Sequence, residues 1–279
     1  MNQYRLRLGA RDVTLLHGPA GWGECSPLPG YPCSLRAAQA AAEEAACTGW
    51  PEPVRDAVPV NALVADGPLP DPMSLAGYPC VKLKVGRRAP DEDVDRVAAV
   101  RDMVAPSTRV RVDANGAWDL DTAVSTLSRL ARFDVELAEQ PVASLDDLAR
   151  IRRRVAVAVA ADECVRGVDD ARRLRSLDAA DAVVVKVQPL GGVRAALDVA
   201  QVAAVPAIVT SMMETSVGVA AGVALACALP ELPYACGLAT AALLDHDVVA
   251  EPLVPASGVI RRRAVTPDPA LLERYAVTR

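Results

Sequence analysis

The chain has 279 residues, of which 52% are hydrophobic and 23% are charged, a composition typical of a globular protein with a full-sized core. It excludes disordered, collagen-like and coiled-coil proteins. The formal net charge of -5 provides no basic surface for nucleic acid or anionic lipid, so we expect a small-molecule partner, no nucleic acid and no membrane.

The cysteines and the first residues indicate the compartment. Seven cysteines, an odd number, form neither a CxxC pair nor a zinc-ligand spacing, which predicts a reducing environment. Residues 1–12 include three arginines and lack the apolar stretch of a signal peptide, and the longest apolar run, residues 217–229, is too short to span a bilayer. We therefore expect a cytoplasmic protein, whose oligomeric state the sequence leaves open.

Lysine is rare in this chain: Lys82, Lys84 and Lys186 stand beside 27 arginines. Arginine supplies positive charge as well as lysine does, but it does not lose its proton in proteins. Lysine is therefore expected to persist where a side chain must act as a base. Two of the three lie within three residues of each other, which marks the lysines as candidates for catalysis.

Short apolar segments rich in β-branched residues alternate with segments of helical periodicity. The eight candidate strands cover residues 59–64, 80–85, 109–113, 135–139, 155–162, 182–187, 207–210 and, weakly, 234–237. The helical segments between them cover residues 91–103, 120–132, 145–154, 168–177 and 193–203. The strand ends recur every 23–29 residues, which predicts parallel βα units closed into a barrel. No GxGxxG motif follows the first strand, which argues against a dinucleotide-binding sheet.

The first 57 residues have a different pattern. Two short strands at residues 4–8 and 13–17 precede a turn-rich stretch over 18–33 and a helix over 34–48, and the proline-rich segment 51–59 serves as a linker. The predicted fold is therefore α/β: a (β/α)7β TIM-like barrel over residues 58–249 with a small α+β N-terminal capping domain over residues 1–57. The tail, residues 250–279, could join the cap.

Charged and amide side chains end the predicted strands. Because the active site of a parallel barrel lies at the carboxyl ends of its strands, these residues are the candidates for chemistry. They are Lys82, Lys84, Asp113, Asn115, Glu139, Asp162, Glu163 and Lys186. Acidic residues after strands also serve as helix N-caps, a use that competes most strongly for Glu163. Three converging carboxylates instead suit a hard divalent cation, Mg²⁺ or Mn²⁺, because without one they repel each other.

Lysines beside such a cation supply the rest of a mechanism. A divalent cation lowers the pKa of a nearby ammonium group and makes the lysine usable as a general base near neutral pH. The cation also stabilises the enediolate that forms when a proton next to a carboxylate is removed. The strand ends therefore predict a metal site that binds a small-molecule carboxylate substrate.

Five motifs carry a resemblance to a known family. They are Val-Lys-Leu-Lys at residues 81–84, Val-Asp-Ala-Asn-Gly at 112–116, Glu-Gln-Pro at 139–141, Ala-Asp-Glu at 161–163 and Val-Lys-Val-Gln at 185–188. In order and spacing they resemble the enolase superfamily, muconate-lactonizing subgroup, over residues 58–245. Within it, residues 114–118, 186–192, 214–218 and 232–240 are most similar to the o-succinylbenzoate synthase family of actinobacterial type, and Gly-Trp-Gly-Glu at 21–24 fits the cap.

The resemblance implies that Asp113, Glu139 and Asp162 bind the metal ion, and that Lys84 and Lys186 face each other across the substrate. The residues expected to contact the substrate or to support those that do are Lys82, Asn115, Glu163, Ser211, Thr215 and Gly237.

The resemblance also implies a reaction, the Mg²⁺-dependent syn dehydration of 2-succinyl-6-hydroxy-2,4-cyclohexadiene-1-carboxylate to o-succinylbenzoate in menaquinone biosynthesis. It passes through an enediolate that the metal stabilises. By resemblance, Lys84 removes the α-proton and returns it to the departing hydroxide, while Lys186 stabilises the enediolate as a cation. The expected enzyme is a metal-dependent carbon–oxygen lyase.

Two segments depart from the family pattern. The mobile cap loop that closes over the substrate lies before Gly18 in the family, and this segment is shorter here, so its arginines have no clear counterparts. After the seventh strand, Met212 and Met213 are bulkier than the small residues expected there, which would narrow the pocket around the succinyl arm of the substrate.

Two other activities compete with the dehydratase. An N-acylamino acid racemase or dipeptide epimerase of the same superfamily would use both lysines as acid and base. A dipeptide epimerase would also show an Asp-x-Asp after the eighth strand, whereas residues 237–240 contain no acid. A metal-free aldolase would use Lys186 as a Schiff-base nucleophile, but this leaves the three carboxylates unexplained.

Overall fold

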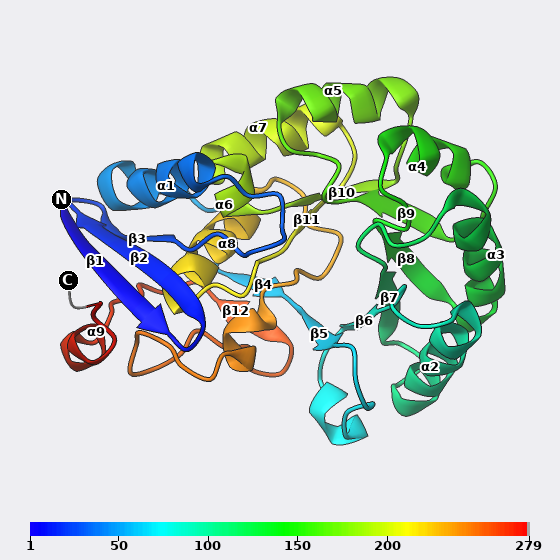
Figure 1. The fold of residues 1–279 in the computed structure, drawn as a ribbon, viewed down its shortest axis with the longest axis horizontal. Coiled ribbons are helices and arrows are strands. Elements are labelled where there is room, and N and C mark those ends of the chain that lie inside the picture. Colours follow the sequence, from blue (N-terminus) through cyan, green and yellow to red (C-terminus); the bar gives the residue numbers. More distant parts are fainter. Residues whose placement is uncertain (278–279) are drawn as a thin grey trace.

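A computed structural model describes residues 1–277 and divides into a small cap and a barrel of parallel strands (Figure 1). Seven neighbouring strands run parallel in the order of the chain. They are β5 (Asn61–Val64), β6 (Cys80–Lys84), β7 (Arg109–Asp113), β8 (Val135–Glu139), β9 (Ala158–Ala161), β10 (Ala182–Val185) and β11 (Ala207–Val209). Each matches a candidate strand of the sequence, and the predicted α/β fold class is confirmed.

The eighth strand position is taken by the short segment that the sequence marks only weakly. Parallel bridges join Val60 to Cys236 and Thr210 to Gly237. The Asn61 amide donates to the Cys236 carbonyl over 2.9 Å, and the Gly237 amide donates to the Val209 carbonyl over 2.8 Å. These contacts place residues 234–237 between β5 and β11 and close the barrel.

Helices follow the barrel strands on the outside. They are α2 (Pro90–Met103), α3 (Leu120–Leu130), α4 (Leu145–Arg152), α5 (Val168–Leu177), α6 (Val187–Leu190), α7 (Val193–Ala203) and α8 (Ser216–Ala228). Short 3₁₀ turns are η2 (Pro72–Leu75), η3 (Ala131–Phe133) and η4 (Ala239–Leu243). The side chains of Asp119 and Ser144 accept hydrogen bonds from amides at the starts of α3 and α4, as N-caps do.

The helix α8 was missed by the periodicity analysis. Its residues 216–227 are all buried, and it contacts the cap strand β3 (Gly21–Cys25) on one side and α7 on another. A helix covered on all sides needs no polar face, so its sequence carries no 3.6-residue pattern. Among residues 1–277, no helix has the length and apolar character that a membrane crossing requires.

The cap contains one strand more than the sequence predicts. A meander of β1 (Asn2–Leu8), β2 (Arg11–Gly18) and β3 packs against α1 (Leu35–Glu43), which continues as a π-helical turn over Glu44–Thr48. The strand β3 falls in the stretch 18–33, where only turns were expected. A side chain at Gly23 would place its Cβ 2.0 Å from the carbonyl oxygen of Ala42 in α1, so glycine is required although it weakens the strand signal.

The tail returns to both parts of the molecule. The strand β12 (Val259–Arg261) pairs antiparallel with β4 (Ala57–Pro59), next to the barrel. Beyond it, α9 (Pro269–Arg274) leads the chain back to β1, where the Arg7 amide donates to the Tyr275 carbonyl over 2.9 Å. In Figure 1, α9 accordingly lies beside the cap strands.

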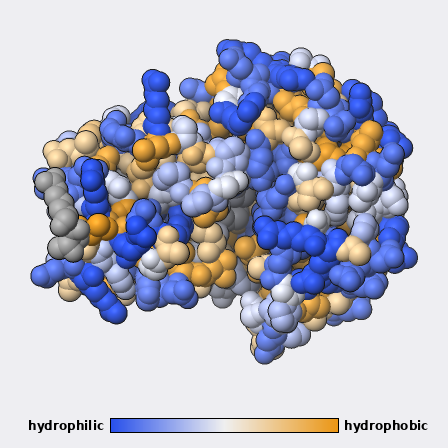
Figure 2. Space-filling view, in the orientation of Figure 1, coloured by the Kyte–Doolittle hydropathy of each residue, from blue (hydrophilic) through white to orange (hydrophobic). Residues whose placement is uncertain are grey.

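Two cap glutamates dock on barrel helices. Glu24 accepts a hydrogen bond from the amide of Gly218 in α8 over 2.9 Å, and Glu44 accepts one from the amide of Val193 at the start of α7 over 2.6 Å. Carboxylates at helix N-termini are favourable because the helix dipole and the free amides both attract negative charge. The two contacts hold the cap beside the mouth of the barrel, where the surface is hollowed in Figure 2.

Candidate active site

A cavity of about 720 Å³ opens at the carboxyl ends of the barrel strands. Residues 28–31 of the cap form one part of its wall, and the strand ends with the loops that follow them form the rest. Ten of the residues expected at the site line this cavity: Lys82, Lys84, Asp113, Asn115, Glu139, Asp162, Glu163, Lys186, Ser211 and Gly237.

Strand register explains why these side chains meet. Asp113 and Glu139 are the last residues of β7 and β8, and they are paired with each other. Lys84 is the last residue of β6 and is paired with Asp113. Asp162 and Lys186 directly follow β9 and β10. Neighbouring parallel strands that end at one level bring their final side chains into one layer.

The two candidate catalytic lysines lie on opposite sides of the barrel. Lys84 belongs to the second barrel strand and Lys186 follows the sixth, so in a closed barrel of eight positions they stand four positions apart. The carboxylates Asp113, Glu139 and Asp162 come from the three strands between them. A substrate in the cavity would therefore lie between the two lysines, with the carboxylates at the strand ends between them.

The lysines of β6 contact the carboxylates directly. Lys82 Nζ lies 2.9 Å from Asp113 Oδ2 and 3.0 Å from Glu139 Oε1, bridging the two strands. Lys84 Nζ lies 2.6 Å from Asp113 Oδ2 and 2.7 Å from Asn115 Oδ1. The Lys84 side chain is 27% exposed and that of Lys82 only 10%. Of the two, Lys84 is thus the lysine open to a ligand.

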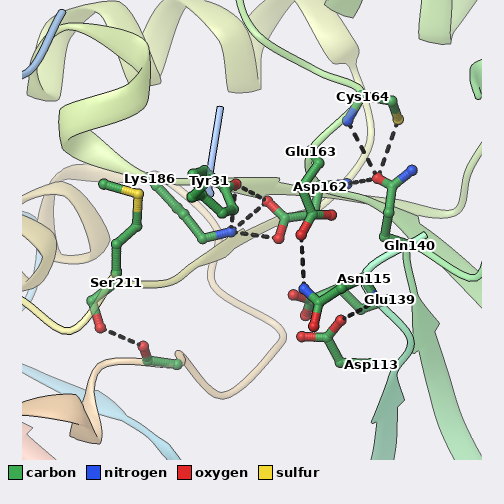
Figure 3. A network of polar contacts seen from close by, with 12 residues as sticks. Tyr31, Asp113, Asn115, Glu139, Gln140, Asp162, Glu163, Cys164, Lys186 and Ser211 are labelled. Carbon is green, nitrogen blue, oxygen red and sulfur yellow. Dashed lines mark hydrogen bonds and ion pairs between the residues drawn. The ribbon is translucent and has the colours of Figure 1, made fainter. Parts of the chain in front are cut away.

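Lys186 forms a second charged group across the cavity. Its ammonium contacts both carboxylate oxygens of Asp162 and donates to the hydroxyl of Tyr31 over 2.9 Å (Figure 3). Tyr31 in turn donates to Asp162 Oδ1 over 2.7 Å. The side chain of Tyr31 was not expected here, because it comes from the cap and not from a strand end.

Amide side chains connect the strand ends. Asn115 Nδ2 donates to Glu163 Oε1 over 2.7 Å, and the Asn115 amide donates to Asp113 Oδ1 over 3.0 Å. The buried Gln140 accepts from the Asp162 amide over 2.7 Å through Oε1. Asn115 and Gln140 both have positive φ, 47° and 39°, a conformation uncommon outside glycine and frequent at functional sites. Gln140 was also missed, although the Glu-Gln-Pro motif contains it.

One expected residue lies elsewhere. Thr215 is absent from the cavity wall described by residues 1–277; it is the N-cap of α8, and its hydroxyl donates to Glu24 of the cap. This contact joins the cap to α8, and a part for Thr215 in contacting the substrate or in supporting the residues that do stays a prediction. Ser211 and Gly237 do line the cavity, where the Ser211 hydroxyl donates to the Gly237 carbonyl over 2.9 Å.

The part of the cap that lines the cavity is not the segment before Gly18. The segment before Gly18 is a hairpin whose strands are joined by the short turn at Gly9 and Ala10. The cap residues that line the cavity come later in the chain, from residues 28–31 between β3 and α1. Met212 and Met213 line the cavity as expected, and Met213 has a strained positive φ of 64°.

Family models match most of the chain. The model described as "Enolase C-terminal domain-like" matches residues 71–267, and the one described as "Enolase N-terminal domain-like" matches residues 4–46. The chain belongs to the enolase superfamily.

Two relatives that are similar to this chain over most of its length have the same name. An o-succinylbenzoate synthase of Thermobifida fusca (strain YX) is 55% identical over 261 residues, covering 91% of this chain and 82% of the relative. An o-succinylbenzoate synthase of Mycobacterium tuberculosis (strain ATCC 25618 / H37Rv) is 44% identical over 273 residues, covering 94% and 82%.

Solved structures of the superfamily support the fold. The muconate lactonizing enzyme from Pseudomonas putida superposes with a TM-score of 0.86 at 21% identity, covering 99% of this chain and 98% of its own. Muconate cycloisomerase from Pseudomonas fluorescens gives the same TM-score at 22% identity. At these identities the likeness bears on the fold, and it agrees with the TIM-like barrel and N-terminal cap.

Burial and neighbouring charges shift the pKa values of the carboxyl groups in the site. Burial together with the charge of Asp113 raises the pKa of Glu139 to about 8. Burial opposes ionisation of Asp113 as well, but the ammonium groups of Lys82 and Lys84 outweigh it and hold the pKa of Asp113 below its ordinary value. Burial also raises the pKa of Glu163. Carboxyl groups outnumber lysines in this cluster: Asp113, Glu139, Asp162 and Glu163 stand beside Lys82, Lys84 and Lys186.

These carboxylates fit a divalent cation, the cofactor that enolase-superfamily enzymes generally use. Asp113, Glu139 and Asp162 offer only hard oxygen donors from adjacent strands, the ligands that Mg²⁺ prefers. The Oε2 atom of Glu163 is buried among residues 1–277 without a hydrogen-bond partner. Among residues 1–277, no three acidic, histidine or cysteine side chains are placed close enough together to hold an ion. Lysine ammonium groups contact Asp113, Glu139 and Asp162.

Proposed function

We propose that this protein is an o-succinylbenzoate synthase, which dehydrates 2-succinyl-6-hydroxy-2,4-cyclohexadiene-1-carboxylate to o-succinylbenzoate. The observation that carries the proposal is the 55% identity with the Thermobifida fusca o-succinylbenzoate synthase over 91% of this chain. The lysines on opposite sides of the cavity and the carboxylates between them are the groups that this reaction needs. The enzyme class is a metal-dependent carbon–oxygen lyase, acting in menaquinone biosynthesis.

In this proposal Asp113, Glu139 and Asp162 hold Mg²⁺ or Mn²⁺. When bound, the cation supplies positive charge to the ring carboxylate of the substrate, which makes the neighbouring carbon acid stronger. Lys82, already 2.9 Å from Asp113, remains beside the ligands and limits the net negative charge of the set. Asn115 and Glu163, joined by a hydrogen bond, lie at the same edge of the cavity and orient Asp113 and the substrate carboxylate.

The first chemical step is a proton transfer to Lys84. The neutral Lys84 amine takes the proton from the carbon bearing the carboxylate, forming an N–H bond as the C–H bond breaks. The electron pair of that bond moves into the carboxylate and gives an enediolate. Lys84 suits this role because it is the accessible lysine of its strand, at the rim of the cavity.

The second step removes the hydroxyl group and makes the ring aromatic. The enediolate pair moves back into the ring, the C–O bond at position 6 breaks, and its electron pair leaves with oxygen. The Lys84 ammonium, on the same face, donates its proton to this departing hydroxide, so that water forms and the amine is restored. One group serving both steps accounts for syn elimination.

Lys186 acts as a cation on the opposite face. Burial lowers the pKa of Lys186, but the charges of Asp162 and Glu139 outweigh it and raise that pKa above its ordinary value. A persistent ammonium beside the enediolate stabilises the negative charge that develops in the transition state. The same ion pair leaves Lys186 poorly suited to the Schiff-base role of a metal-free aldolase, which needs a neutral amine.

The assay follows the new aromatic ring by ultraviolet absorbance. The purified protein with Mg²⁺ is expected to convert the cyclohexadiene substrate into o-succinylbenzoate, with product identity established by mass spectrometry. In a parallel reaction, a single enantiomer of an N-acylamino acid in D₂O reports racemisation through loss of optical rotation. Racemisation without dehydration would transfer the assignment to the racemase alternative.

A further inference from the structure

Tyr31 contacts the catalytic side of the cavity from the cap. Its hydroxyl accepts from Lys186 Nζ over 2.9 Å and donates to Asp162 Oδ1 over 2.7 Å. Its ring lies against the same ammonium, with 4.7 Å between Nζ and the ring centroid. Tyr31 therefore holds the ammonium by a hydrogen bond and by a cation–π contact at once, as Figure 3 lets the reader follow.

A tight turn presents this side chain. The Tyr31 amide donates to the Leu28 carbonyl over 3.2 Å, closing a four-residue turn around Pro29 and Gly30. A type II turn favours proline at the second position and needs a residue such as glycine at the third, where Gly30 has a φ of 84°. The turn has few alternative conformations, so Tyr31 is delivered to the site in a defined place.

The base of the turn is tied to the helix that follows Lys186. The Ser26 amide donates to Gln188 Oε1 over 2.8 Å, and both residues are buried. Gln188 belongs to α6, which begins directly after Lys186. Arg11 adds a hydrogen bond of 2.8 Å to the Ser26 carbonyl. The cap turn and the lysine are therefore anchored to one another at two points, Ser26 and Tyr31.

The other partner of Lys186 is shared with the metal site. Within residues 1–277, the ammonium contacts the two oxygens of Asp162 and the hydroxyl of Tyr31. Because Asp162 is a proposed ligand of the divalent cation, the ion and the ammonium compete for its oxygens. Tyr31 also donates to Asp162 Oδ1, but it accepts from Lys186 through its own hydroxyl oxygen, so this contact does not depend on the carboxylate. A long, flexible lysine side chain would otherwise lose much of its orientation when the ion binds.

We propose that Tyr31 is a positioning residue for Lys186. It keeps the Lys186 ammonium directed at the substrate while Asp162 binds the divalent cation. This inference rests on the proposed dehydration, because its kinetic consequence is measured there. The cap thereby takes part in the reaction, because docking of residues 26–31 completes the surroundings of the Lys186 ammonium on one face of the substrate.

The first test compares Tyr31→Phe, which keeps the ring, with Tyr31→Leu, which removes ring and hydroxyl. Misplacing a group that acts on the transition state lowers kcat, so we expect kcat to fall about 10-fold in Tyr31→Phe and about 100-fold in Tyr31→Leu, with KM changed less than about threefold. Tyr4→Phe, at an aromatic pair on the outer cap sheet, is the matched control and should keep wild-type kcat. A rise in KM at unchanged kcat would make Tyr31 a substrate contact and overturn the proposal.

A second test reads Lys186 without turnover. Since the chain has only three lysines, protein labelled with ¹³C at lysine Cε should give three side-chain signals in an NMR spectrum, which Lys186→Arg and Lys84→Arg assign. Tyr31→Leu removes the ring beside Lys186 and is expected to shift the Lys186 signal most, with little change at Lys82 and Lys84. A Lys186 signal unmoved by Tyr31→Leu, in a folded variant, would overturn the proposed contact.

A third measurement separates Lys186 from Asp162. Mn²⁺ affinity, followed by loss of the free-ion paramagnetic resonance signal, should change less than about threefold in Tyr31→Phe. A larger loss of affinity, with the lysine spectrum unchanged, would mean that Tyr31 acts through Asp162 and would refute the role assigned here. If wild-type protein forms no o-succinylbenzoate, the dehydratase proposal fails, whereas the NMR test still decides the contact between Tyr31 and Lys186.

Discussion

Glu24 in the cap and Gly218 in the barrel are joined by a buried hydrogen bond, in which the Gly218 amide donates to Glu24 Oε2 over 2.9 Å. The amide and hydroxyl of Thr215 donate to the same carboxylate. The cap thereby supplies the negative group at the start of α8, a helix whose own residues are almost all apolar. A second buried carboxyl group, Glu214, lies close by, and its negative charge would be repelled by that of Glu24.

Glu214 predicts a pH-dependent stability. Burial, reinforced by the charge of Glu24, raises the pKa of Glu214 from 4.5 to about 7. Between these values the folded protein keeps a proton that the unfolded chain has lost, so the free energy of unfolding falls as pH rises from about 4.5 to about 7 and then levels off. A shift of this size corresponds to about 3 kcal/mol. Glu214→Gln should remove that contribution.

Urea unfolding at pH 5 and pH 8, with chelator present throughout, measures the effect. Glu214→Gln should gain stability relative to wild type at pH 8 and lose that advantage at pH 5. Glu231→Gln, at an exposed glutamate, is the matched control and should differ from wild type equally at both pH values. A difference for Glu214→Gln that does not vary with pH would contradict the raised pKa.

Gly23 predicts a steric limit on cap packing. An added Cβ would lie 2.0 Å from the Ala42 carbonyl oxygen, a backbone atom that cannot turn away. Gly23→Ala must push α1 from the sheet, and we expect a loss of about 2 kcal/mol in the free energy of unfolding. Gly167→Ala is the control: its backbone is extended and no atom lies within 4 Å of the added Cβ. Equal urea midpoints for the two variants would contradict this account.

The barrel could be predicted from the sequence because its strands and helices alternate visibly. Predicted helices 168–177 and 193–203 agree with α5 and α7 at both ends. The failures have physical causes. The helix α8 is covered on all sides and has no polar face, and β3 carries Gly23, which packing against α1 requires. The expected division into residues 1–57, 58–249 and 250–279 stays a prediction, since the tail contacts both parts.

The candidate site could be predicted as far as it lies on strand ends. Residues such as Lys84 and Glu139 are revealed by their place in the repeating βα unit. Tyr31 and Gln140 are not, because one comes from the cap and the other turns beneath the strand ends to accept from the Asp162 amide. The only sequence signal for Tyr31 was the Pro29-Gly30 turn, which predicts a turn but not what the turn faces.

Removal of the metal ion gives a prediction for the carboxylates. Exhaustive chelation should abolish turnover, and Mg²⁺ or Mn²⁺ should restore it, because the substrate carboxylate then again meets a cation. Asp113→Asn, Glu139→Gln and Asp162→Asn should each weaken Mn²⁺ binding, measured by paramagnetic resonance. Glu163→Gln should weaken it less, since Glu163 is hydrogen-bonded to Asn115. Full activity of the chelated wild-type protein would refute the metal site.

The last prediction distinguishes a base from a charge. Lys84→Arg keeps positive charge beside Asp113 but removes the base, because a guanidinium does not deprotonate in proteins. Dehydration should therefore fall by about 10³-fold or more while the melting temperature changes little. Lys186→Arg still presents a cation to the enediolate, and it should retain more activity than Lys186→Ala.

Solvent exchange completes the comparison of the two lysines. If Lys84 alone exchanges the α-proton, Lys84→Arg should stop incorporation of deuterium from D₂O into recovered substrate, and Lys186→Arg should still permit it. A two-base racemase would instead need both lysines to carry protons, so either Arg variant would stop inversion while exchange on the remaining side continued. Near-normal dehydration by Lys84→Arg would refute the general-base role. Equal losses of dehydration in the two Arg variants would favour proton transfer at both faces, because a lysine that serves only as a cation tolerates the replacement better than one that must give up its proton.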